Sequence, residues 1–171
     1  VGAGIIYSSI KKHGYDAEFL DMAFLDNPLQ KLKERLKSFQ PDVICISIRN
    51  IDNHVMQKSE SYLPFTKQVV SICRNNCSCK IIVGGAAMQV MPNEIMDYLQ
   101  VDFGIIGPGE IEIISILREL DGTGTTCAKK ENRLRIANNY FHPILSCIPE
   151  KDIFDNKYFN YCTNIKKTVI G

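Results

Sequence analysis

Hydrophobic and polar positions follow two patterns that alternate along the chain. In KLKERLKSF, leucines recur at helical spacing with lysines on the opposite face, which predicts an amphipathic helix. DVICISI is a continuous apolar run between turn signals, as in a strand buried on both faces. By these criteria helices are predicted over 3–13, 28–39, 61–76, 92–100 and 109–120. Strands are predicted over 16–22, 42–48, 80–85 and 101–107. Strands and helices in alternation, with short connections, predict an α/β domain with a parallel sheet and helices on both faces.

The alternation of predicted strands and helices ends near residue 121. NRLRIANNY (132–140) is expected to form one strand of a hairpin, and the Pro- and aromatic-rich segment 141–161 to be an extended linker on a neighbouring surface. We therefore predict an α/β domain over 1–120, followed by a hairpin and linker over 121–171. A first, central strand is not visible before the helix at 3–13. We expect a piece of a longer protein, because the chain opens at Val1 without an initiator Met and stops at TVIG.

Composition narrows the class of protein. The 171 residues carry a formal net charge of +1, which gives no general attraction to nucleic acid or to an anionic membrane. No apolar run approaches the length of a transmembrane helix. The seven cysteines are odd in number, and Cys45 falls inside a predicted strand. We expect free thiols in a reducing cytoplasm, with no disulfide framework.

Three polar or glycine-rich segments follow successive predicted strands. They are SIRNIDN (47–53), GGAAMQVMP (84–92) and GPGE (107–110). Ligands of open parallel sheets bind outside the carboxyl ends of the strands, so these segments form a candidate site. Glycines let a bulky ligand approach the backbone, and Gly107 and Gly109 expose amides at a helix start. Glu110 at the same place argues for a ligand with hydroxyl or amide groups rather than a bare phosphate.

Each segment also has a plainer interpretation. Gly84-Gly85 could be a tight turn, and GPGE a turn that leads into a helix. The polar side chains of SIRNIDN could form a solvated loop, with Asn50 or Asp52 capping the next helix. The three segments on successive strand ends are more specific than any one of them. Neither G-x-G-x-x-G after the first strand nor G-x-x-x-x-G-K-[ST] is present, so dinucleotide and P-loop sites lack their phosphate cradle.

Four separated motifs together resemble one family. SIRNIDN, YLP (62–64), KIIVGGAAMQVMPNEIM (80–96) and DFGIIGPGE (102–110) occur in the order found in the cobalamin-binding domain of B12-dependent radical S-adenosylmethionine enzymes. The similarity covers about residues 1–120, and 140–171 looks like that family's linker into the catalytic barrel. Members with an R-N-x-D-N loop are closest, and several of these are methyltransferases.

The resemblance implies a flavodoxin-like (Rossmann-type), five-stranded sheet that holds the corrin ring on its carboxyl edge. The nucleotide tail would swing away from cobalt into the sheet. Residues beside or below the corrin would be Ser47, Ile48, Arg49, Asn50, Asp52 and Asn53. Gly84, Gly85 and Ala86 would line the tail, and Gly107, Pro108, Gly109 and Glu110 would close over it. The full-length enzyme would also hold a [4Fe-4S] cluster and S-adenosylmethionine in its radical S-adenosylmethionine domain.

On this reading Arg49 lies below the cobalt. A guanidinium keeps its proton and is not a metal ligand, so it would leave that face without a nitrogen donor. Cobalt would then stay low-coordinate and be easier to reduce. The alternative, which stays open, is that Arg49 pairs with Asp52 or another nearby carboxylate.

Two motifs imitate metal sites. DNHVMQ (52–57) resembles the D-x-H-x-x-G loop whose His binds cobalt in methionine-synthase-type domains, but Gln57 replaces the Gly and the loop follows a different strand. His54 is therefore expected to be a solvated loop residue. CRNNCSC (73–79) has the spacing C-x-x-x-C-x-C, whereas radical S-adenosylmethionine enzymes use C-x-x-x-C-x-x-C. We expect no metal ligand in this chain.

The predicted function is therefore a cobalamin-binding domain that is not catalytic by itself, in an enzyme that is expected to be a methyltransferase. Two other classes remain open. One is a domain of the same descent that has lost cobalamin and serves as a structural or interaction module. The other is a flavin- or nucleotide-binding domain of flavodoxin type, which would need a phosphate loop after the first strand.

Overall fold

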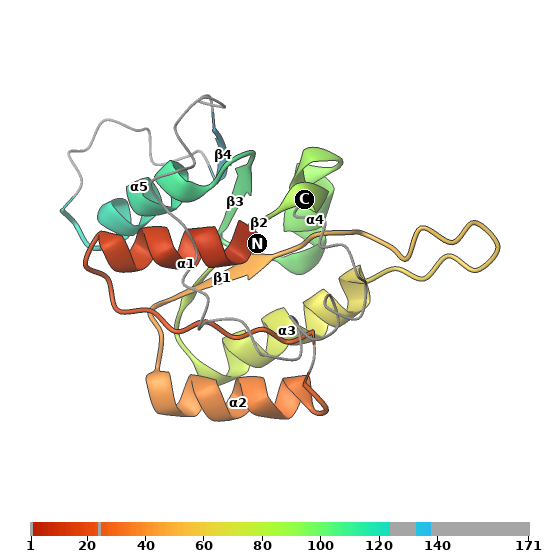
Figure 1. Ribbon diagram of the computed structural model, residues 1–171, viewed down its shortest axis with the longest axis horizontal. Helices are drawn as coiled ribbons and strands as arrows, with labels where there is room; N and C mark the ends of the chain where they lie inside the picture. Colours follow the sequence, from red (N-terminus) through yellow and green to blue (C-terminus); the bar gives the residue numbers. More distant parts are fainter. Residues whose placement is uncertain (1, 24, 124–132, 138–171) are drawn as a thin grey trace, which may run out of the picture.

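Four strands form one parallel sheet in the computed structural model, which describes residues 2–23, 25–123 and 133–137. Their order is β1-β2-β3-β4 (Figure 1). The strands are β1 (Val43–Ser47), β2 (Lys80–Gly84), β3 (Phe103–Ile106) and β4 (Leu134–Ile136). Ser47 pairs with Gly84, and Gly104 with Leu134. The parallel register brings all carboxyl ends to one edge, as the pattern of 42–107 predicted.

Helices cover both faces of the sheet (Figure 1). They are α1 (Gly2–Lys12), α2 (Pro28–Phe39), α3 (Leu63–Asn76), α4 (Pro92–Leu99) and α5 (Glu110–Leu120), with a 3-10 turn η1 (Ala86–Gln89) after β2. A proline in the first turn starts α2, α3 and α4, where its missing N–H costs nothing. Helices α1 and α5 pack together on one face, whereas α2, α3 and α4 occupy the other. All five predicted helices are present, close to the predicted limits.

Strand β2 shows why the fold needs apolar residues on both faces. Ile82 joins the core beside α5, whereas Ile81 and Val83 join the core beside α3 and α4. All three are at most 2 % exposed. Burial of each such side chain contributes about 1.5–3 kcal/mol relative to exposure. Position 104 of β3 favours glycine, because a Cβ there would lie 2.5 Å from Met96 Sδ.

Two elements differ from the predictions. Residues 16–22 are extended but form no strand, because no described strand lies beside them to complete a ladder. Leu134–Ile136 is a strand as predicted. It pairs in parallel with β3 and so continues the main sheet, whereas the sequence predicted one strand of a hairpin. The predicted linker over 141–161 lies outside the described residues.

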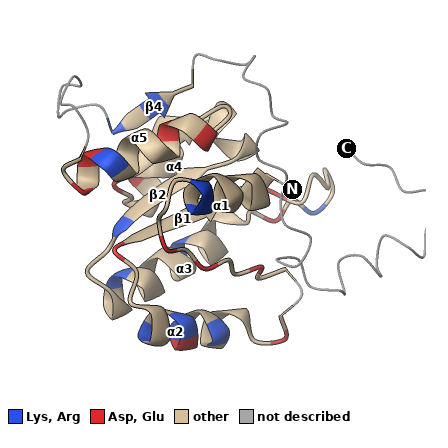
Figure 2. Cartoon of the chain, turned by 60° about the vertical axis from the view of Figure 1, so that its left-hand side comes forward, with Lys and Arg blue, Asp and Glu red and all other residues tan. Residues whose placement is uncertain are grey.

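Charge is distributed without a dominant sign (Figure 2). Helix α2 buries Leu32 and Leu36 against the core and exposes its lysines. None of the helices in the described part of the chain is long and apolar enough to span a membrane.

Candidate functional site

The three polar segments meet at the carboxyl edge of the sheet, as predicted. Residues 47–53 continue from β1, 84–86 from the end of β2, and 107–110 from β3. The backbone joins the first two directly. Ile48 N–H donates to Gly84 O at 2.8 Å, and Ala87 N–H donates to Ile48 O at 3.1 Å. Residues distant in the sequence therefore form one continuous surface.

The end of β1 presents a free cationic side chain and a free amide. Ser47, Arg49 and Asn50 are exposed, and among the described residues neither Arg49 nor Asn50 forms a side-chain hydrogen bond or ion pair. The open alternative that Arg49 pairs with Asp52 is thus wrong here, since Asp52 contacts His54 instead. Ile48 behaves differently. It is 4 % exposed and packs into the core, so only its backbone lies at the site.

Asp52 and Asn53 use their side chains to build a projecting loop. Asp52 Oδ1 accepts from His54 N–H at 2.9 Å, and Asn53 Oδ1 accepts from the N–H groups of Val55 and Glu60 at 3.1 Å each. Asn53 Nδ2 donates to Lys58 O at 2.9 Å. This hydrogen-bonded loop, residues 51–62, is the long extension at the right of Figure 1. Both side chains therefore have a structural role, which the sequence did not reveal.

His54 lies on this loop with its side chain 73 % exposed. Its backbone has φ +55°, a left-handed conformation that a β-branched residue would not tolerate. The ring Nδ1 is 3.4 Å from Asp52 Oδ1. These contacts agree with the expected solvated loop residue.

Gly84 and Gly85 serve different purposes. Gly85 has φ +99°, and a Cβ at this residue would come 2.5 Å from Ile48 O. A side chain is therefore excluded because the β2–η1 turn packs on the backbone that follows β1. A Cβ at Gly84 would meet nothing closer than 3.8 Å, so Gly84 leaves room at the edge. Ala86 is exposed beside them.

The GPGE segment joins β3 to α5. Gly107 has φ +89°, and a Cβ at Gly109 would come 3.1 Å from Ile6 Cδ1 of α1. Among the described residues no side chain caps α5, which leaves its first N–H groups available to a ligand. Pro108 and Glu110 are half-buried, and Glu110 O accepts a hydrogen bond from Ser9 Oγ at 3.1 Å. This segment is thus held against α1.

Exposed apolar side chains at this edge were not predicted. They are Val55, Met56, Tyr62, Phe65, Val90 and Met91, all in segments that follow β1 or β2. Met56 is fully exposed. A group of exposed large apolar residues marks a binding surface more often than a solvated one. The sequence feature that could have indicated this surface is the apolar pair Val55-Met56 within an otherwise polar loop.

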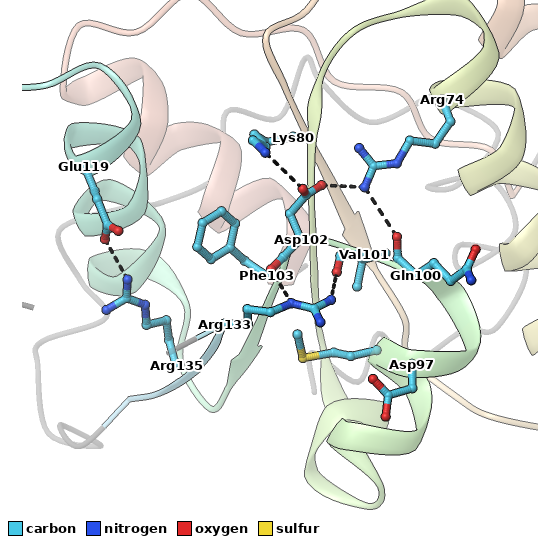
Figure 3. A pocket seen from close by; sticks show the side chains of 11 residues that line it. Arg74, Lys80, Asp97, Gln100, Val101, Asp102, Phe103, Glu119, Arg133 and Arg135 are labelled. Carbon is cyan, nitrogen blue, oxygen red and sulfur yellow. Dashed lines mark hydrogen bonds and ion pairs between the residues drawn. The ribbon is translucent and has the colours of Figure 1, made fainter. Parts of the chain in front are cut away.

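A pocket lies at the opposite edge, where the strands begin (Figure 3). It has a volume of about 560 Å³. Its centre is Asp102, which accepts from Arg74 at 2.5 Å, from Lys80 at 3.2 Å and from Ile81 N–H at 2.9 Å. Desolvation alone would raise the pKa of Asp102, but these three donors lower it below its usual value.

The basic side chains that line this pocket form ion pairs or hydrogen bonds with other residues of the chain. Arg135 pairs with Glu119 at 2.6 Å, and Arg133 donates to the carbonyls of Val101 and Asp102 (Figure 3). These ion pairs and hydrogen bonds therefore hold the starts of the strands together. We assign the functional site to the carboxyl edge and a structural role to this pocket.

The cysteines of CRNNCSC belong to the core. Cys73 and Cys79 are buried, and burial raises the pKa of Cys73 to about 12. Its thiol is therefore protonated at neutral pH and is neither a ready nucleophile nor a ready metal ligand. The described residues include no group of His, Cys, Asp and Glu able to hold a metal ion.

A parallel sheet with exposed polar and glycine segments at its carboxyl edge defines a ligand-binding α/β domain. Residues 1–116 match the family model of the B12 binding domain, and the chain belongs to this family.

Individual relatives agree with this assignment. A tryptophan 2-C-methyltransferase from Streptomyces laurentii is 26 % identical over 117 residues, which are 68 % of this chain and 20 % of the relative. The chain thus spans about a fifth of the length of this curated relative.

Two solved structures of the radical S-adenosylmethionine methyltransferase TsrM from Kitasatospora setae share the fold. The structure with tryptophan and a SAM analogue has a TM-score of 0.69 and 18 % identity, and covers 78 % of this chain and 26 % of its own. The structure with cobalamin and a [4Fe-4S] cluster has a TM-score of 0.66 and 20 % identity, with 71 % and 22 % covered. The flavodoxin-like, Rossmann-type prediction is confirmed at the level of fold.

Proposed function

We propose that this chain binds cobalamin on the carboxyl edge of its sheet and belongs to a cobalamin-dependent radical S-adenosylmethionine methyltransferase. The observation that carries the proposal is the B12 binding domain match over residues 1–116. That range contains the three segments that the fold brings together at one edge. Dinucleotide binding has no comparable support, because its glycine fingerprint is absent from the sequence.

The residues at this edge fit a corrin, which is a wide disc fringed by amides. Asn50 offers an amide with no internal partner among the described residues, so it can both donate and accept. The open space at Gly84 permits close approach of the nucleotide tail, which would continue past Gly85 and Ala86. The segment 107–110 would close over the tail with the free N–H groups of α5.

When bound, cobalamin would supply the cobalt that relays a methyl group from S-adenosylmethionine to the substrate. Arg49 would lie at its lower face. The guanidinium is free of internal ion pairs within the described residues and offers no lone pair to a metal. We therefore assign to Arg49 the exclusion of a nitrogen ligand from that face. Asp52 and Asn53 would contribute by holding the loop that borders the ring.

The remaining functions belong to the whole enzyme. Residues 1–120 would form the cofactor domain, and 121–171 would lead toward a radical S-adenosylmethionine domain with its [4Fe-4S] cluster in the same polypeptide. The named relatives, both methyltransferases, support this reaction class. The free thiols Cys45, Cys73, Cys77 and Cys79 support a reducing cytoplasm.

An absorption titration of the 171-residue chain with hydroxocobalamin tests cofactor binding. Electron paramagnetic resonance of the cobalt(II) form then reports the lower ligand. We expect saturable binding and no nitrogen splitting in the unchanged chain and in His54→Ala. Arg49→His places an imidazole where the guanidinium lay, and a nitrogen triplet should appear. Arg49→Gln is the matched control, which removes the charge without adding a ligand.

Two outcomes contradict the proposal. If the folded chain binds no cobalamin, the domain is a structural or interaction module. If the unchanged chain shows a nitrogen triplet that His54→Ala removes, His54 is the lower ligand and the role assigned to Arg49 is wrong.

A further inference from the structure

Another groove runs along the outer side of α3 and has a volume of about 420 Å³. Leu29 of α2 and Tyr98 of α4 line it from the two helices that α3 contacts. The other lining residues all belong to α3, and we call this feature the α3 groove. They are Pro64, Lys67, Gln68, Ser71 and Ile72.

The helical spacing of α3 explains why the α3 groove faces outward. Val69, Val70 and Cys73 are buried and pack into the core. The groove residues of α3 recur at intervals of three and four, so they share one side of the helix. With about 3.6 residues per turn, that side lies opposite the buried one. A ligand can therefore reach the groove without any change in the core.

The lining combines apolar surface with a few polar groups. Leu29 and Ile72 are half-buried, and Tyr98 is 40 % exposed. The Gln68 amide and the Ser71 hydroxyl are exposed and have no hydrogen-bond partner among the described residues. Sites for small molecules are mostly apolar hollows of about 300–1,000 Å³ in which a few polar groups fix the orientation of the ligand. The α3 groove has this composition and this size.

Lys67 gives the α3 groove its charge. Its Nζ lies 4.2 Å from the centre of the Tyr98 ring, and this cation–π contact holds the ammonium group over the groove. The Lys67 side chain is half-buried and forms no ion pair with a carboxylate of the described residues. None of the described residues that line the groove is Asp or Glu. Because a partly buried charge is stabilised by an opposite charge, the groove favours an anionic ligand.

We propose that the α3 groove binds a small carboxylic acid with an apolar body. Lys67 and Ser71 are one helical turn apart, a spacing at which two side chains can contact the same group. Both donate hydrogen bonds to the ligand carboxylate, while the apolar body packs on Leu29, Ile72 and the Tyr98 ring. A phosphate would carry more charge than the single cation of the groove can neutralise. This site shares no residue with the segments at the carboxyl edge, so it does not rest on the proposed function.

A titration of the isotope-labelled 171-residue chain with phenylacetate, followed by NMR, tests the proposal. We expect saturable shifts centred on residues 67–72 and on Tyr98, with a Kd of about 1 mM, as suits a ligand of this size. Phenylacetamide is the matched uncharged ligand. It should bind at least about threefold more weakly, because it lacks the ion pair with a partly exposed Lys67.

Three variants locate the binding site. Lys67→Gln should weaken phenylacetate binding at least about threefold and leave phenylacetamide binding unchanged. Lys33→Gln is the matched control, since it removes the same charge from an exposed residue of α2 that does not line the groove. Ser71→Trp fills the groove from an exposed position, so it should abolish binding while the NMR spectrum stays that of a folded chain.

Three results overturn the proposal. Equal affinities for phenylacetate and phenylacetamide would show that the groove does not select an anion. Shifts centred on Arg49 and Asn50, or competition by hydroxocobalamin, would place the acid at the carboxyl edge. The groove would also be excluded if binding did not saturate at about ten times the expected Kd, or if it persisted in Ser71→Trp.

Discussion

Gly84 and Gly85 are adjacent, but the structure predicts opposite consequences for an alanine at each. Gly85 has φ +99° and ψ 178°, a region that essentially only glycine adopts. A Cβ there would lie 2.5 Å from Ile48 O and 2.9 Å from Ile48 N. Backbone strain costs about 1–3 kcal/mol, and overpacking adds about 1–3 kcal/mol. Gly85→Ala should therefore reduce the free energy of unfolding by about 2–6 kcal/mol.

Gly84→Ala is the matched control. Its Cβ would meet Ile105 at 3.8–3.9 Å, an ordinary contact, and its φ is not in the positive range. The free energy of unfolding should change by less than about 1 kcal/mol, because an alanine also restricts the unfolded chain. Any effect on cobalamin affinity in this variant then reports the approach of the ligand, and a loss of more than about tenfold is expected.

Urea unfolding followed by circular dichroism measures the difference. With m near 2 kcal/mol per M of urea, the midpoint of Gly85→Ala should fall by about 1–3 M while m stays constant. Equal midpoints for the two variants would refute the close approach of Gly85 to Ile48, and with it the geometry assigned to this edge.

Further predictions concern the loop, the strand starts and the site. Asn53→Ala removes three hydrogen bonds of about 1 kcal/mol each, so loop amides should exchange faster, whereas Asn50→Ala should leave them unchanged. Because the pKa of Asp102 is lowered in the folded state, its contribution to stability is present above its usual value of 3.8 and is lost as pH falls through the folded value. As the pH is lowered from neutral to 3, the urea midpoint should fall less in Asp102→Asn than in Asp97→Asn. Equal falls would contradict the stabilising role of the Asp102 carboxylate at the strand starts. Arg49→Ala should change the free energy of unfolding by less than about 0.5 kcal/mol, since the side chain is exposed; a larger loss in thermal unfolding would mean that Arg49 is structural.

Much of the fold followed from local chemistry in the sequence. Prolines at the starts of α2, α3 and α4 and glycine after α1 mark helix limits. The apolar run of β2 required burial on both faces, and a parallel sheet is the structure that provides it. The parallel order also placed 47–53, 84–86 and 107–110 at one edge, since carboxyl ends of parallel strands coincide.

The roles of individual side chains depended on tertiary packing. Sequence alone could not separate Gly84 from Gly85, because the difference lies in the distance to Ile48, a residue far away along the chain. It grouped Asn50 with Asn53 as ligand contacts, whereas the fold uses Asn53 to close its loop and leaves Asn50 free. Hydrogen-bond partners depend on which residues the fold brings together, and residue type alone does not determine this.

The segment 16–22 shows the same division most clearly. Its residues predicted a strand, and the segment follows an extended path (Figure 1) with Leu20 and Met22 packed against the core beside α2 and α3. Whether it becomes a strand is decided by a neighbouring strand that can bond to its backbone, because a ladder needs two strands. The sequence by itself determined the conformation of this segment, and the tertiary structure decided its pairing.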